Sequence, residues 1–153
     1  MNILLQFLLI GHIIFGLLGI ILFYILLMAL LKPLNSNKIK SLKKYSFFGF
    51  LSFVLSWLFG GHYYVIYYGA FVKPIIKKGA YPWAHSIFME TKEHIFLFLP
   101  FAALITVFIF YFLGEELEKK PAIKKAVLLL SSVIVIIGTI VALMGITVSG
   151  AVR

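Results

Sequence analysis

Three of the four histidines lie inside or at the edge of long apolar runs, where an ionisable side chain is costly and is therefore a functional candidate. They are His12, His62 and His94. Imidazole is the commonest metal ligand in proteins. The chain has no cysteine, so thiolate metal sites, iron–sulfur clusters and disulfides are excluded. These residues predict a site in which two or three imidazoles bind a metal ion or a haem iron.

The three histidines are predicted to lie at one level of a membrane. Counting 1.5 Å per residue from the inner end of each predicted helix puts His12 about 28 Å up, His62 about 24 Å and His94 about 30 Å. This level is close to the outer edge of a hydrocarbon core about 30 Å thick. Glu90 is predicted one turn above His94 on the same helix face. A carboxylate would then accompany the three imidazoles.

Helical periodicity predicts which way these side chains point. At 100° per residue, His62 falls on the opposite side of its helix from a group of four tyrosines, Tyr63, Tyr64, Tyr67 and Tyr68. Tyrosines at this height are typical of an aromatic belt facing lipid headgroups, so we expect His62 to point into the bundle. The fourth histidine, His85, lies near Trp83 and opposite His94, and an interfacial position is expected for it.

Small residues are predicted to make room beside the histidines. Gly16 and Gly19 lie below His12 on the same face of the first helix. The fourth predicted helix carries a face of mostly small side chains, namely Ser131, Val135, Gly138, Ala142, Gly145 and Ser149. Such faces admit a flat cofactor, but they also favour close packing of membrane helices without any cofactor.

Two cofactor predictions follow from these groups. In the first, haem b takes one or two of His12, His62 and His94 as axial ligands, and Gly16 and Gly19 admit the macrocycle. Lysines at the outer rim would pair with the propionates, namely Lys73, Lys77 and Lys78. In the second, a zinc, copper or iron ion is bound by His12, His62 and His94, with Glu90 as a fourth ligand or as a base for bound water.

The composition predicts the elements that must hold this site. The chain has 153 residues, of which 63% are hydrophobic and 12% charged, too few polar residues to cover a water-soluble globule. At about 20 apolar residues per span, it accommodates four helices, predicted over about 3–31, 46–72, 86–113 and 122–148. The fold class predicted is all-α, a single domain over residues 1–153 that forms an integral membrane antiparallel up-down four-helix bundle.

The charge distribution predicts the orientation of this bundle. The net charge is +9, from 14 Lys and Arg against five acidic residues. Connections 32–45 and 114–125 carry five and four cations, whereas 73–93 and the C-terminus carry four and one. Connections 32–45 and 114–125 are therefore predicted to be cytoplasmic and both termini outside. Nucleic acid is excluded as a partner because the chain has no basic polar face.

In general plan, the predicted architecture resembles the small four-helix membrane b-type cytochromes, although no family motif accompanies the resemblance. The function predicted first is electron transfer or a related oxidoreductase step at a haem or metal site near the outer membrane face. Its partners would be the lipid bilayer and a redox protein or quinone. Two alternatives stay open: a membrane metalloenzyme such as a zinc hydrolase with Glu90 as general base, and a non-catalytic assembly or accessory subunit with structural histidines.

Overall fold

The computed structural model describes residues 2–152 and is built from helices joined by short connections. Its elements are α1 (Ile3–Leu30), α2 (Ser36–Tyr63), the π-helix η1 (Tyr64–Val72), α3 (Lys73–Lys78), the π-helix η2 (Ala84–Met89), α4 (Glu90–Phe96), α5 (Phe98–Leu113), the 3-10 helix η3 (Gly114–Glu116) and α6 (Pro121–Gly150). Consecutive elements join into four helices long and apolar enough to cross a membrane, which are Ile3–Leu30, Ser36–Lys78, Ala84–Glu116 and Pro121–Gly150. The prediction of an all-helical chain with four such helices is confirmed.

The first connection is shorter than the predicted 32–45, because α2 begins at Ser36. Asn35 caps this helix: its side-chain oxygen accepts a hydrogen bond from the Lys38 amide at 2.9 Å. An asparagine at this position satisfies one of the unpaired amides of the first turn. Four of the five lysines assigned to the connection therefore lie on the first turns of α2.

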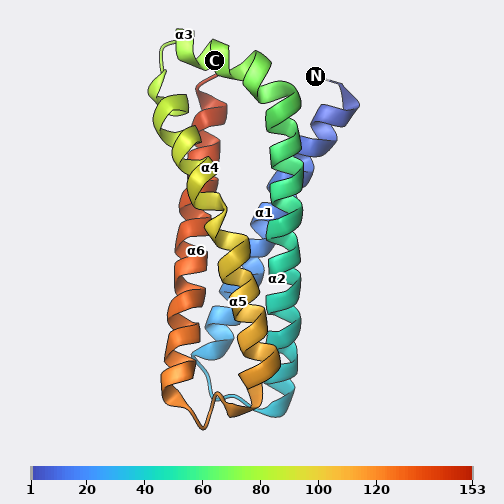
Figure 1. Ribbon diagram of the computed structural model, residues 1–153, viewed down its shortest axis with the longest axis vertical. Helices are drawn as coiled ribbons and strands as arrows, with labels where there is room; N and C mark the ends of the chain where they lie inside the picture. Colours follow the sequence, from blue (N-terminus) through green and yellow to red (C-terminus); the bar gives the residue numbers. More distant parts are fainter. Residues whose placement is uncertain (1, 153) are drawn as a thin grey trace.

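The four long helices extend between the same two ends of the molecule, and α1 crosses the others obliquely (Figure 1). The start of α1, the end of α6 and α3 lie at one end of the molecule, here called the termini end. The turns from α1 to α2 and from α5 to α6 lie at the opposite end, here called the loop end. At the termini end, η1 and α3 lead across from α2 toward α4 and α6 (Figure 1).

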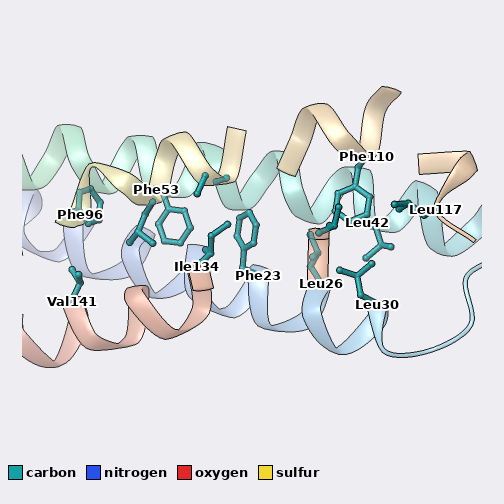
Figure 2. Packing of buried hydrophobic residues seen from close by; sticks show 14 residues of the cluster. Phe23, Leu26, Leu30, Leu42, Phe53, Phe96, Phe110, Leu117, Ile134 and Val141 are labelled. Carbon is teal, nitrogen blue, oxygen red and sulfur yellow. The ribbon is translucent and has the colours of Figure 1, made fainter. Parts of the chain in front are cut away.

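The main hydrophobic core extends from the loop end to the middle of the bundle. Figure 2 shows its buried side chains, from Leu30 and Leu117 to Phe96 and Val141. Within it, the rings of Phe23 and Phe53 stack with their centroids 5.8 Å apart. This core contains side chains from all four long helices and so fixes their relative positions in the half of the bundle nearer the loop end.

A second, smaller cluster closes the termini end. It consists of Tyr68, Ile76, Ala84, Val148 and Ala151. These residues come from η1, α3, η2 and the end of α6, so the cluster attaches the irregular helices to α6. The two π-helices depart from α-helical geometry, and wide turns of this kind occur frequently at functional sites.

Candidate functional site

Two adjoining cavities lie between the two hydrophobic clusters. The first, here the deep cavity, has a volume of about 540 Å³ and extends to Ile20 and Gly138 in the middle of α1 and α6. The second, here the tyrosine cavity, has a volume of about 610 Å³ and extends to Val72 and Val152 at the termini end. Both volumes lie within the range of about 300–1,000 Å³ that is typical of small-molecule sites.

The two cavities share four polar side chains on their common wall. These are His12 from α1, Ser56 from α2, Lys92 from α4 and Ser149 from α6. All four long helices therefore contribute a polar side chain to the wall between the two cavities.

Hydrogen bonds fix the orientation of the His12 ring. Its Nδ1 lies 2.9 Å from the carbonyl oxygen of Ser56, and the Ser56 hydroxyl donates to the His12 carbonyl at 2.9 Å. A carbonyl oxygen only accepts, so the proton is on Nδ1. Nε2 is then the acceptor, and the ammonium nitrogen of Lys92 lies 3.4 Å from it.

Glycines make room for this polar group. A Cβ atom at Gly60 would overlap the His12 ring. A Cβ atom at Gly145 would lie 3.3 Å from the Lys92 ammonium nitrogen, and one at Gly16 would lie 3.2 Å from the Ser56 hydroxyl. The close approach of α1, α2, α4 and α6 at this level therefore depends on the absence of side chains at three positions.

Opposite charges reach the tyrosine cavity from two consecutive residues of α4. Lys92 and Glu93 both line this cavity and are both half-buried. Across residues 2–152, the ion pairs within 4.0 Å involve other residues. One carboxylate oxygen of Glu93 is buried and has no hydrogen-bond partner in the described chain. The cavity thus holds a cation and an anion that do not form an ion pair within 4.0 Å.

Six aromatic side chains also line the tyrosine cavity. They are Trp57, Tyr63, Tyr64, Tyr67, Tyr68 and Phe96. The rings of Tyr64 and Tyr68 stack at 5.2 Å, and those of Tyr63 and Tyr67 lie 5.6 Å apart. The prediction that these tyrosines form a lipid-facing belt is wrong for Tyr68, which is buried, whereas Tyr63, Tyr64 and Tyr67 remain partly exposed.

His85 supports the tyrosine wall from behind. Its side chain is 0% exposed, and its Nδ1 lies 3.0 Å from the Tyr68 hydroxyl. Its Nε2 lies 3.8 Å from a carboxylate oxygen of Glu90 and has no hydrogen-bond partner within residues 2–152. The interfacial position expected for His85 stays a prediction; its side chain is enclosed against Tyr68 of the smaller cluster, whereas the neighbouring Trp83 is exposed.

Of the three predicted histidine ligands, only His12 lines the cavities. His62 is exposed, so the prediction that it points into the bundle is wrong. His94 is also exposed, and its Nδ1 donates to the carbonyl of Glu90 at 2.7 Å. Within residues 2–152, no group of three or more His, Asp or Glu side chains is arranged to hold a metal ion. The structure does not bring the predicted ligand set together.

The predicted small residues divide between the cavity and packing. Gly16 lines the deep cavity, and on α6 so do Gly138, Ala142, Gly145 and Ser149. Gly19 instead lies under the Phe53 ring, where a Cβ atom would come within 2.7 Å of the ring. Gly19 therefore serves the contact between α1 and α2.

Sequence reasoning missed Ser56, Lys92, Tyr68 and Glu93 as cavity residues. A signal for Ser56 was present in the second span, where small side chains recur every three or four residues. They are Ser46, Gly49, Ser52, Ser56 and Gly60. Such a stripe marks the close-packed face of a membrane helix, and it would have placed His62 on the other side.

No protein-family model, curated protein or solved structure matches this chain. Its function is therefore argued from the site alone.

Proposed function

We propose that this chain is an integral membrane protein that binds an amphipathic molecule in its two cavities. In this proposal it is inserted as an antiparallel up-down four-helix bundle with both termini outside, in keeping with the distribution of its lysines. The cavities then lie in the outer half of the membrane. The ligand has an apolar body and an oxygen-rich or negatively charged polar group.

The observation that carries this proposal is the contact between Lys92 and His12. An ammonium group within a membrane-spanning segment is costly unless an acceptor or an anion accompanies it. Here its nearest recorded polar neighbour is the neutral Nε2 atom of His12, at 3.4 Å. An ammonium group has three N–H donors; a phosphate, carboxylate or carbonyl oxygen of a ligand would supply a further acceptor, and such charge-assisted contacts are the stronger class of hydrogen bond.

The walls of the deep cavity support the apolar part of the ligand. Around the polar group they consist of aliphatic and aromatic side chains, including Ile20, Phe53 and Leu99. The small face of α6 forms the rest. A hydrocarbon chain would fill this cavity without leaving a polar group unpaired, and any apolar surface it removes from water adds to the stability of the complex.

Binding of dodecyl phosphate to the detergent-solubilised protein, measured by native mass spectrometry, tests the proposal. We expect saturable binding, weakened at least about tenfold by Lys92→Met, which corresponds to about 1.4 kcal/mol. Lys125→Met is the matched control because Lys125 is exposed on α6 and distant from the cavities. Wild-type protein that does not bind, or that binds equally after Lys92→Met, would contradict the proposal.

A second candidate function is the redox function predicted first, with haem b as the bound molecule. His12 favours it, because a metal-binding histidine commonly donates one ring N–H to a backbone carbonyl and presents its other nitrogen to the metal. A haem here would have one imidazole ligand, with Lys92 beside it. A redox protein or quinone would be the partner in electron transfer.

Absorption spectra of the purified protein, oxidised and dithionite-reduced, test the haem candidate, with metal analysis of the same sample. A Soret band that is lost in His12→Ala and retained in His62→Ala would support haem at this site. About one zinc, copper or iron without such a band would favour the metalloenzyme alternative. Protein that stays colourless and metal-free after reconstitution, and that binds no amphiphile, would leave an accessory subunit as the remaining function.

A further inference from the structure

We propose that the molecule bound across both cavities is a zwitterionic phospholipid. Its phosphate contacts Lys92, whose ammonium group His12 positions through Nε2, its ammonium group contacts Glu93 among the tyrosine rings, and its acyl chain occupies the deep cavity. This inference rests on the proposed function, because the phosphate contact is the anion contact argued above.

The site contains one positive and one negative side chain. Lys92 and Glu93 line the same cavity, and neither belongs to any ion pair within 4.0 Å recorded in the described part of the chain. A purely anionic ligand would bring a negative charge close to the Glu93 carboxylate, and like charges at short range in a low-dielectric site repel strongly. A ligand with one charge of each sign compensates both side chains at once.

Aromatic rings share with Glu93 the wall of the tyrosine cavity. Four tyrosines and Trp57 line this cavity, and the faces of such rings attract ammonium groups, most strongly where water is excluded. A carboxylate oxygen of Glu93 is buried there without a hydrogen-bond partner. Burying a charged oxygen without a partner is costly, and an ammonium group would supply that partner.

The two cavities extend to different depths along the bundle. Both cavities reach the termini end, the tyrosine cavity at Val152 and the deep cavity at Gly150, but the deep cavity alone extends to Ile20 and Gly138 near the middle of their helices. The charged group would therefore lie close to the membrane surface and the apolar group close to the midplane, which is how a phospholipid lies in one leaflet. A bound lipid would keep the orientation it already has in the bilayer.

Competition between lipids with identical acyl chains tests this inference, measured by native mass spectrometry of the full-length protein in detergent. Wild-type protein is expected to bind phosphatidylcholine or phosphatidylethanolamine at least about tenfold more tightly than phosphatidylglycerol. Glu93→Gln keeps the size of the side chain but removes its charge, and it is expected to reduce this ratio to about one. Lys92→Met is expected to weaken binding of all these lipids.

Glu115→Gln is the matched control, since Glu115 lies at the loop end and its side chain is 62% exposed. It is expected to leave the ratio unchanged, and circular dichroism checks that each variant is folded. A ratio near one in the wild type, or a ratio that Glu93→Gln does not change, overturns the inference. If lipid binding is still weakened by Lys92→Met in that case, the proposed function stands although the inference of a zwitterionic lipid is overturned.

Binding of the isolated headgroup, phosphocholine, tests whether the ligand is a lipid or a soluble zwitterion. Phosphocholine is expected to bind at least about a hundredfold more weakly than phosphatidylcholine, because it leaves the deep cavity without a hydrocarbon chain. Equal affinity for the two would overturn the assignment to a lipid. Absence of binding of every lipid and of dodecyl phosphate would overturn both this inference and the proposed function.

Discussion

The Tyr68 hydroxyl and Nδ1 of His85 lie 3.0 Å apart, in a position where the His85 side chain is fully enclosed. Tyr68 belongs to η1 and His85 to η2, so this contact joins the two π-helices that lie on either side of α3. It also fixes one tyrosine of the cavity wall. The shape of the tyrosine cavity therefore depends on a histidine that does not itself line the cavity.

Tyr68→Phe removes the hydroxyl and leaves both ring nitrogens of His85 without a hydrogen-bond partner. A buried polar group that loses its partner costs about 1–3 kcal/mol, and we expect a loss of stability of that size. Thermal unfolding in detergent measures it. Tyr24→Phe is the control, because Tyr24 is 53% exposed on α1. An equal effect of the two substitutions would show that the contact with His85 contributes nothing.

Gly60→Ala is expected to displace the His12 ring, since the added Cβ atom overlaps it. Overpacking of this kind typically costs about 1–3 kcal/mol, and the displaced ring would also weaken binding of dodecyl phosphate. Gly69→Ala provides the control, because Gly69 lines neither cavity and a Cβ atom there would lie 3.5 Å from its nearest neighbour, an ordinary contact. Binding and unfolding are measured for both variants. If Gly60→Ala binds like wild type, His12 does not take part in recognition.

His12→Ala is expected to weaken binding of dodecyl phosphate, whereas His62→Ala and His94→Ala are expected to leave it within about twofold of wild type. The reason is position: His12 lines both cavities, and the other two are exposed. Exposed substitutions usually change stability by less than about 0.5 kcal/mol. Weaker binding after His62→Ala or His94→Ala would restore the three-histidine site predicted from the sequence.

Glu118 is expected to stabilise the loop end in a pH-dependent manner. A single carboxylate oxygen accepts hydrogen bonds from the Lys124 ammonium and from the Leu34 amide, each at 2.8 Å. The bond from Lys124, and then that from Leu34, lowers the pKa of Glu118 below its usual value of 4.5. This contact joins the turn after α1 to the turn before α6.

Because the pKa is lower in the folded state, the stabilisation is complete above the unfolded pKa and is lost as the pH falls through the folded pKa. Glu118→Gln is therefore expected to reduce the unfolding temperature at about pH 7 and to have little effect at about pH 3. Unfolding at both pH values measures this difference. A reduction of equal size at the two values would contradict a role for the ionised carboxylate.

At the termini end, helical periodicity correctly assigned residues to opposite sides of each helix. It could not identify which of the two sides faces the interior of the bundle. On the second long helix, His62 and Tyr68 do point to different sides, and on the third so do His85 and His94. In both helices the inward side was assigned wrongly. Tyrosine and histidine each combine an apolar ring with a polar atom, so either can face a lipid headgroup or a partner inside the bundle.

The small residues of the chain were more informative than its histidines. Gly16 and the small face of α6 were predicted to leave space, and they line the deep cavity. A small side chain on a long apolar helix has few uses other than close packing or space for a ligand. Its meaning therefore depends less on context than that of a histidine.

The sequence by itself determined the four long apolar helices, because the length and apolarity of each run are properties of consecutive residues. Only the tertiary structure decided which polar side chains meet. His12, Ser56 and Lys92 come from three helices and are separated by as many as 80 positions in the chain. Whether they meet depends on the rotation of each helix about its own axis, which is set by packing at Gly16, Gly60 and Gly145. Such contacts across helices follow from complementary shapes, which no single stretch of the sequence contains.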